Sequence, residues 1–317
     1  MIHLLNPLWD AAGGSEWRTL KLFDLLRRRG EVRLWSEQDA DPRLAAAYPI
    51  ERIDVSAGRF PVGGTLVVVG VYFPVGSWIR ESRPGRIVLH YNTPWRPGLE
   101  SRLALLRDLA PLEIVFASDT LRARTGMEGV VQLSPIDISA FSPGPPRPAG
   151  APFTVGRLSR DVPEKHHPED PALYRRLVDP GARVRLLGGT CLPEIPGVER
   201  LPAKAEPAVD FLRSLDVFVY RTSPRWHEVF GRVVYEAMAC GLPVVVHRQG
   251  GYLEHLDPGR NGLVFDTEAE AVEHLLSLKG DPGRRASLGA AARASIERLY
   301  SPAWAEELGA WYLRPRT

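Results

Sequence analysis

The sequence is poor in features typical of secreted, membrane-spanning and nucleic-acid-binding proteins. Its 317 residues include two cysteines, Cys191 and Cys240, which show no metal-ligand spacing and suit a reducing compartment better than a disulfide framework. The 40 basic and 38 acidic side chains leave a formal charge of only +2, so nothing global indicates a nucleic acid partner. The most apolar stretch, 66–75, is too short to span a bilayer. The N-terminus lacks the basic segment of a secretory signal, and we expect a cytoplasmic protein.

Short apolar runs instead alternate with polar segments rich in proline and glycine. With 317 residues and 44% hydrophobic composition, the chain can form two domains of ordinary size. Runs without polar alternation are typical of strands buried on both faces of a parallel sheet. This rhythm predicts α/β domains of the doubly wound type. The strands that we expect in the first half lie at 2–6, 32–35, 66–71, 87–90 and 113–118.

Residues 142–152, SPGPPRPAGAP, contain too much proline and glycine for a helix or a central strand. We interpret them as the linker between the domains. The sequence therefore predicts a first domain over 1–145, a second over 146–300, and a last helix within 301–317.

The stretch 226–251, WHEVFGRVVYEAMACGLPVVVHRQGG, dominates the second half. Seven residues separate Glu228 from Glu236, and Glu236 lies on an otherwise apolar helix, where an unpaired carboxylate is costly. Gly241 suits the end of that helix, and 244–246 is a short buried strand. Gly250-Gly251 follows the strand at its carboxyl end, where open α/β sheets bind ligands.

This string resembles the donor site of the retaining glycosyltransferases of family 4, which have the GT-B fold. The resemblance rests on Glu-x7-Glu, a helix of small residues, a Gly-x-Pro-Val strand and a Gly-Gly loop. It implies two Rossmann-like domains facing a cleft, with a C-terminal helix crossing back to the first domain. It further implies transfer of a sugar from a nucleotide-diphosphate donor, a UDP-sugar being favoured over a GDP-sugar. The acceptor would be a glycan, a lipid-linked sugar or a small molecule. No cofactor or metal is expected.

By the same resemblance, Glu236 would hold the ribose hydroxyls and Glu228 would orient the donor sugar. Arg157 and Lys165 would neutralise the diphosphate, although Lys165 lies in a loop longer than usual for the family. His90, at the end of a predicted strand, would contact the donor sugar; a structural histidine bonded to a nearby carbonyl is the alternative. The remaining expected donor contacts are Gly13, Gly14, Gly188, Phe230, Gly231, Arg232, Val233, Gly250 and Gly251.

Gly13-Gly14 follows the first predicted strand and precedes a predicted helix over 15–29 with Ser15 as its N-cap. Glycines let a phosphate approach the backbone N–H groups at a helix start, but a plain turn has the same pattern. Lys21 and residues 27–29 place basic charge on this helix. That charge is either a solvated face or a contact for the anionic inner face of a membrane.

Two other functions are compatible with these motifs. One is a GT-B sugar-nucleotide epimerase, which would turn over donor without acceptor. The other is a non-catalytic partner subunit that binds the nucleotide sugar without transferring it. The sequence does not indicate an oligomeric state.

Overall fold

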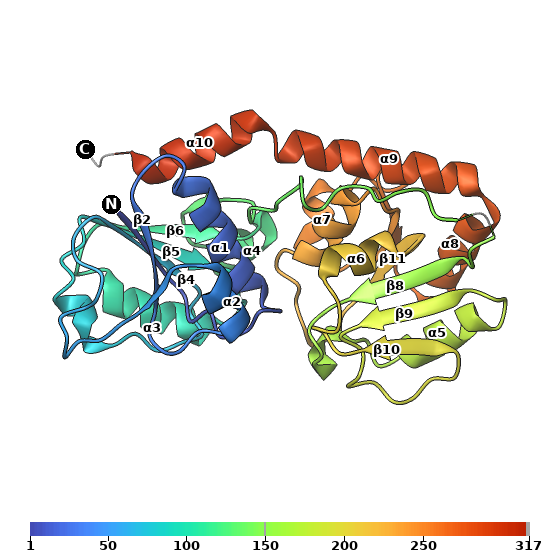
Figure 1. Ribbon diagram of the computed structural model, residues 1–317, viewed down its shortest axis with the longest axis horizontal. Helices are drawn as coiled ribbons and strands as arrows, with labels where there is room; N and C mark the ends of the chain where they lie inside the picture. The colour runs from blue at the N-terminus through green and yellow to red at the C-terminus, as the bar shows by residue number, and fades with distance from the viewer. Residues whose placement is uncertain (149, 315–317) are drawn as a thin grey trace. The chain divides into compact units, whose positions relative to one another are not determined.

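The computed structural model describes residues 1–148 and 150–314 and divides into two compact units. Unit 1 joins Met1–Ile136 to the chain from Ser301 onwards, and unit 2 is Asp137–Tyr300. Each unit contains one parallel sheet with helices on both faces, as the alternating apolar runs predict (Figure 1).

Unit 1 has a seven-stranded sheet in the order β3-β2-β1-β4-β5-β6-β7, with every neighbouring pair parallel. The strands are β1 (Ile2–Leu5), β2 (Val32–Ser36), β3 (Ile50–Arg52), β4 (Thr65–Val69), β5 (Arg86–Tyr91), β6 (Leu112–Phe116) and β7 (Val130–Val131). The helices are α1 (Gly14–Leu26), α2 (Pro42–Ala47), α3 (Arg96–Leu106), α4 (Asp119–Thr125) and α10 (Pro302–Leu313), and a 3-10 turn, η1, spans Ser77–Arg80.

The C-terminal helix α10 completes the core of unit 1. It lies beside α1 (Figure 1) and buries Leu308 and Tyr312 against the sheet. The guanidinium of Arg86 on β5 donates to the carbonyls of Trp311 and Tyr312, at 3.1 and 3.2 Å, near the end of the helix. The predicted return of the last helix to the first domain is confirmed.

Helix α1 begins one residue before the predicted start. Gly13 is its N-cap, and no side chain caps it, so the prediction of Ser15 as N-cap is wrong. The Ser15 hydroxyl instead accepts from the amides of Asn6 and Asn92, at 3.1 and 3.0 Å. Because these bonds link the ends of β1 and β5 to α1, Ser15 ties the helix to the sheet.

Unit 2 has a six-stranded parallel sheet in the order β10-β9-β8-β11-β12-β13. The strands are β8 (Thr154–Leu158), β9 (Arg183–Leu187), β10 (Val198–Leu201), β11 (Val217–Tyr220), β12 (Val244–His247) and β13 (Leu263–Phe265). The helices are α5 (Asp170–Val178), α6 (Ala208–Arg213), α7 (Arg232–Ala239), α8 (Glu268–Gly280) and α9 (Pro282–Leu299), with 3-10 turns η2 (Pro163–Lys165) and η3 (Gly251–His255).

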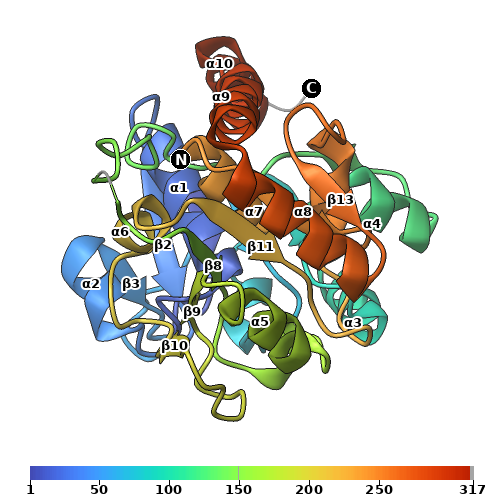
Figure 2. The ribbon, with the colours of Figure 1, turned by 90° about the vertical axis from the view of Figure 1, so that its right-hand side faces the viewer.

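The side chains of β11 alternate between the two faces of the sheet of unit 2. Val217 and Val219 join the hydrophobic cluster beneath α5 and α8, which pack on each other (Figure 2). Phe218 and Tyr220 point to the opposite face and stack, with ring centroids 6.0 Å apart. Tyr220 therefore reaches the loops that precede α7.

The segment after Asp137 belongs to unit 2, so the division lies before the boundary that we placed between 145 and 146. Arg213 donates to the Ser142 carbonyl at 2.9 Å. Arg293 on α9 donates to the carbonyls of Ile138 and Phe141, at 3.0 and 2.8 Å. These bonds fix the start of the proline-rich segment to unit 2, and composition alone could not show this.

Candidate functional site

The candidate site lies at the carboxyl edge of the sheet of unit 2. In the order β10-β9-β8-β11-β12-β13, the chain reverses its direction of winding between β8 and β11. Loops that leave these two strands diverge there, and doubly wound sheets bind ligands at such a point. The loops after β8, β9, β11 and β12 carry most of the residues that we predicted for unit 2.

Lys165 and Glu228 meet in an ion pair at this edge. Lys165 ends the turn η2 after β8, and its Nζ lies 2.5 Å from Glu228 Oε2. The Tyr220 hydroxyl donates to the same oxygen at 2.8 Å. Both side chains of the pair are about nine-tenths buried. The lengthened loop therefore does bring Lys165 to the first glutamate of the motif.

The two pKa values of this pair follow from burial and from mutual attraction. Burial alone would raise the pKa of Glu228, but Lys165 and the Tyr220 hydroxyl outweigh it and hold that pKa below its usual value. Burial lowers the pKa of Lys165, and Glu228 offsets part of this effect. The pair is therefore a buried carboxylate beside a buried ammonium.

Helix α7 begins at Arg232, four residues after Glu228. Gly231 caps the helix in the left-handed conformation, with φ 77°. A Cβ atom on Gly231 would lie 2.4 Å from the ring of Tyr252, and one on Gly250 would meet the same ring at 2.4 Å. The N–H of Gly251 donates to the Glu228 carbonyl at 2.8 Å. Glycines at these positions thus let the chain pack around Tyr252, which holds the Gly-Gly loop beside Glu228.

Arg157 is more deeply buried than we expected for a residue that contacts a diphosphate. Its side chain on β8 is 1% exposed and lies over the ring of Tyr220, 4.9 Å from the centroid. The guanidinium donates to the Arg221 carbonyl and lies 3.5 Å from an oxygen of Asp170. In this arrangement Arg157 is directed into unit 2 and not toward the loops at its edge.

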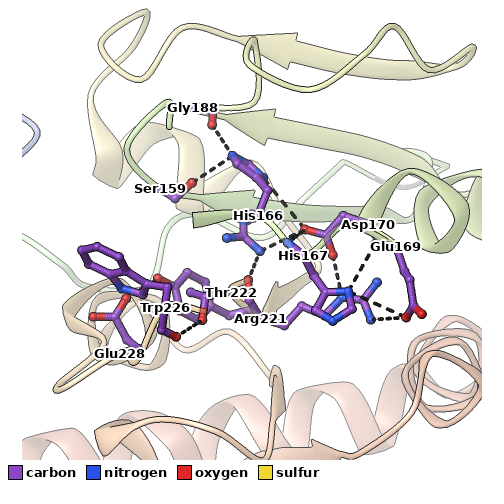
Figure 3. A network of polar contacts seen from close by, with 12 residues as sticks. Ser159, His166, His167, Glu169, Asp170, Gly188, Arg221, Thr222, Trp226 and Glu228 are labelled. Carbon is purple, nitrogen blue, oxygen red and sulfur yellow. Dashed lines mark hydrogen bonds and ion pairs between the residues drawn. The ribbon is translucent and has the colours of Figure 1, made fainter. Parts of the chain in front are cut away.

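Asp170 anchors a buried polar network that the sequence did not reveal (Figure 3). It begins α5, is completely buried, and accepts from Arg221 Nε at 2.6 Å and from the His167 N–H at 3.0 Å. Asp170 thus lies at the N-terminus of α5 between two arginines, Arg157 and Arg221. No local signal singles out Asp170, because its partners lie far apart in the sequence.

His166 links this network to Gly188, which we predicted to lie near the nucleotide. Its Nε2 lies 2.7 Å from the Gly188 carbonyl and 3.4 Å from the Ser159 hydroxyl (Figure 3). Burial and the charge of Arg157 lower the pKa of His166 to about 4, so the ring is neutral at pH 7. A Cβ on Gly188 would lie 1.8 Å from the Ser159 carbonyl oxygen, and its φ is 88°. Gly188 therefore brings the loops after β8 and β9 together.

Glu236 is paired within its own helix. It accepts from Arg232 Nε at 2.7 Å, and both side chains are 9% exposed. Burial raises the pKa of Glu236, and Arg232 opposes this shift. Phe230 stacks on Tyr235 with ring centroids 4.5 Å apart, so it packs in the core. Val233 lies in the first turn of α7 and is half-buried.

In unit 1, His90 has the environment of a structural histidine. Alternation along β5 places it on the face covered by α1 and α10, where it is 1% exposed. Arg18 Nε donates to Nδ1 at 2.9 Å, so Nε2 carries the ring proton and contacts the Tyr312 hydroxyl at 2.6 Å. Burial and Arg18 hold the pKa of His90 well below its usual value. Both ring nitrogens are occupied, which favours the structural alternative over contact with a sugar.

Gly13 and Gly14 lie at the start of α1, as predicted. A carboxylate oxygen of Glu16 would be 1.9 Å from a Cβ on Gly13, so the Glu16 side chain folds back over this helix end. Glu16 is 3% exposed. A carboxylate already occupies the position beside Gly13, which weakens the phosphate interpretation of this turn.

The basic charge on α1 and directly after its end is largely paired. Lys21 and Arg27 both contact Asp24, at 3.1 and 3.3 Å, and Arg29 contacts Glu306 on α10 at 2.5 Å. This pairing favours the solvated face over a lipid contact. No helix within 1–148 or 150–314 combines the length and apolar character that crossing a bilayer requires.

One Asp-x-Asp pattern, Asp39-Ala40-Asp41, occurs in unit 1. Asp41 caps α2 by accepting from the Arg43 N–H, and its other oxygen accepts from the Ala11 N–H. Asp39 pairs with Arg52 at 2.9 Å. These carboxylates have structural partners, and among the described residues no group of three metal-ligating side chains comes together.

A sequence model of one family, described as glycosyl transferases group 1, matches residues 203–295. The chain is 40% identical over 93 residues to the D-inositol 3-phosphate glycosyltransferase of Arthrobacter sp., a match that covers 29% of this chain and 21% of that protein. It is 34% identical over 174 residues to the GDP-mannose-dependent alpha-mannosyltransferase of Mycolicibacterium smegmatis, covering 51% and 43% of the two chains. The matches thus span less than half the length of these curated relatives.

Solved structures resemble the chain over almost its entire length. Anabaena Alr3699/HepE in complex with UDP-glucose superposes with a TM-score of 0.74 at 17% identity, covering 98% of this chain and 97% of that one. WaaG, a glycosyltransferase involved in lipopolysaccharide biosynthesis, superposes with a TM-score of 0.67 at 12% identity, covering 99% and 100%. At these identities the likeness shows a shared fold.

Proposed function

Because this chain belongs to the group 1 glycosyl transferases of family 4 and has the GT-B fold, we propose that it transfers a sugar from a nucleoside diphosphate donor to an acceptor hydroxyl. A UDP-sugar is the favoured donor and a GDP-sugar the second choice. The acceptor is a glycan, a lipid-linked sugar or a small molecule. The proposed reaction retains the anomeric configuration, requires no metal and takes place in the cytoplasm.

The Lys165–Glu228 pair is the observation that carries this proposal. The two residues are 63 positions apart, yet folding places them 2.5 Å apart at the point where a doubly wound sheet binds its ligand. A buried pair costs free energy unless its geometry is good, and apolar residues of similar size often stabilise a fold as well. A chemical role accounts for ionised groups at this edge better than stability does.

The leaving group of the reaction is a nucleoside diphosphate, so negative charge grows on its phosphate as the sugar bond breaks. Lys165 supplies a fixed positive charge there, and the N–H groups at the start of α7 supply dipoles. Glu228 accepts a ring hydroxyl and orients the sugar. Glu236 accepts the ribose hydroxyls through the oxygen that Arg232 leaves unused.

Retention requires either a covalent intermediate or attack from the face that the leaving group vacates. Glu228, the carboxylate that we propose to contact the donor sugar, already accepts hydrogen bonds from Lys165 and Tyr220, and this makes it a poor nucleophile. We therefore favour same-face attack, with the leaving phosphate taking the acceptor proton.

The test is a transfer assay. The wild-type protein is incubated with UDP-glucose, GDP-mannose and related donors and a panel of acceptors, and the released nucleotide and the glycosylated product are measured. Lys165→Ala should lower kcat about 100- to 1,000-fold, the usual effect of removing one group that stabilises developing charge. The control is Lys279→Ala, which removes a half-buried lysine of α8 in the same unit that donates to the Pro180 carbonyl.

Transfer by Lys165→Ala at the wild-type rate would contradict the role of the pair. Donor turnover that needs no acceptor would indicate an epimerase, and donor binding without any turnover would indicate a partner subunit.

A further inference from the structure

Two cations at the candidate site share one aromatic ring. Lys165 Nζ lies 4.6 Å from the ring centroid of Trp226, and the guanidinium carbon of Arg160 lies 5.7 Å from it. Trp226 and Arg160 belong to the loops after β11 and β8, on either side of the point where the sheet changes direction. Sequence analysis assigned neither residue to the site.

Lys165 and Arg160 together carry two positive charges, and the carboxylate of Glu228 neutralises one of them. Lys165 is paired with Glu228. Arg160 is half-buried, and within the described part of the chain its guanidinium makes no hydrogen bond or ion pair. Its charge nonetheless reaches the pair, because it lowers the pKa values of both Lys165 and Glu228. The surplus charge favours an anionic ligand.

Trp226 also presents an unsatisfied donor. Its indole Nε1 is buried and has no acceptor among the described residues. A buried N–H without a partner costs about 1–3 kcal/mol. Because Lys165 and Arg160 lie beside this N–H, an anionic oxygen is the acceptor that suits it best. Figure 3 shows the Trp226 indole beside Glu228 and apart from the Asp170 network.

Arg157 cannot take this role in the observed arrangement. It is 1% exposed, donates to the Arg221 carbonyl and lies against Asp170. Moving it to the edge would leave the fully buried Asp170 with one cation fewer. Arg157 therefore acts through the Asp170 network as a positioning residue.

We propose that Arg160 and the indole N–H of Trp226 bind a phosphate of the donor's diphosphate, a contact that the family motif assigns to Arg157. This inference rests on the proposed function, since it supposes a nucleoside diphosphate ligand. It extends that function by naming two residues that select a diphosphate over a nucleoside.

The experiment is calorimetric titration with UDP, UMP and uridine, and with GDP, GMP and guanosine. The proteins are the wild type, Arg160→Gln, Arg160→Lys and Trp226→Phe, which keeps the ring and removes the N–H. Arg225→Gln, an exposed arginine of the same loop as Trp226, is the matched control. Thermal melting of each variant checks that it is folded.

We expect Arg160→Gln to weaken binding of the preferred nucleoside diphosphate about 10- to 100-fold, as for a hydrogen bond to a charged group. Trp226→Phe should weaken it about tenfold. Nucleoside binding should not change in either variant, and Arg160→Lys should recover part of the loss because it restores the charge.

Two results would overturn the inference. Diphosphate affinity in Arg160→Gln and Trp226→Phe equal to that of the wild type would show that neither group touches a phosphate. Equal losses for nucleoside and diphosphate would show a structural effect. Failure of the proposed function differs from both, because then no nucleotide binds the wild type even at millimolar concentration.

Discussion

Lys165 and Glu228 form the pair on which both proposals depend, and its coupling is measurable. Removal of one partner leaves a buried charge without its counter-charge, so Lys165→Met and Glu228→Gln should each destabilise unit 2 by about 3–5 kcal/mol. Chemical denaturation of the wild type, both single variants and the double variant gives the coupling energy. The double variant should lose much less than the sum of the two.

Arg176 and Glu268 provide the control pair. They lie 3.1 Å apart on the surface of unit 2, with side chains 50% and 20% exposed. The corresponding cycle should give a coupling of about 0–1 kcal/mol. A coupling at Lys165–Glu228 as small as this would show that the pair is not formed in solution.

His166 predicts a specific acid sensitivity. Its pKa is about 4 in the folded protein, against 6.5 for a free side chain. The unfolded state therefore binds more protons between pH 6.5 and 4, so folding stability is full above pH 6.5 and falls as the pH drops through this window. The loss attributable to His166 is about 3 kcal/mol.

Replacing the imidazole ring of His166 should remove its contribution to the pH dependence of folding stability. Denaturation of His166→Gln at pH 7 and pH 4.5 should show a smaller difference than the wild type, while His274→Gln on α8 serves as the matched control. An unchanged slope in His166→Gln would show that the ring is not buried as a neutral group.

Single residues also show what sequence alone could not provide. The family resemblance implied that Glu228 and Lys165 contact one ligand, and the structure brings the two side chains together. The resemblance could not predict the burial of Arg157, because this depends on Asp170 and Arg221, which come from other elements. For His90, position in the sequence indicated a strand end but not the face, and α10 covers that face.

Helix α7 depends on a glycine whose role is conformational. Gly231 has φ 77° and abuts Tyr252, whereas Gly259 has φ 85° and open space around it. Gly231→Ala should combine a strain of about 1–2 kcal/mol with the cost of displacing the ring, about 1–3 kcal/mol. Gly259→Ala should show the strain alone.

Thermal melting and nucleotide titration of both variants separate these effects. Gly231→Ala should lose stability and nucleotide affinity, because displacing Tyr252 moves the Gly250-Gly251 loop; Gly259→Ala should lose stability only. Equal losses of stability and of nucleotide affinity in the two variants would show that Tyr252 does not position the Gly250-Gly251 loop.

Glycine and proline residues explain which ends of helices and strands were predictable from the sequence. Gly241 and Pro243 marked the end of α7 and the start of β12, because glycine readily adopts the left-handed conformation that ends a helix and proline cannot continue one. The start of α1 was predicted one residue late, since Ser15 has the composition of an N-cap but bonds to Asn6 and Asn92 instead. Such bonds are tertiary and leave no local pattern.

Unit 1 is formed from two separate stretches of the chain, because α10 follows unit 2 in sequence but packs in unit 1. Truncation after Tyr300 removes Leu308 and Tyr312 from that core, which should destabilise unit 1 by about 3–6 kcal/mol. Hydrogen exchange should accelerate in β5 but not in β11. Truncation after Arg314 is the control, and comparable exchange in the two truncated proteins would contradict the placement of α10.

Hydrogen–deuterium exchange with and without donor tests the central claim most directly. The protein is compared alone and with saturating UDP-glucose or GDP-mannose, whichever binds. We expect protection of the loops at 159–167, 221–231 and 248–252, which contain Lys165, Glu228 and the glycine loop of unit 2. Protection confined to other segments, or none in the presence of a bound nucleotide sugar, would contradict the proposed donor site.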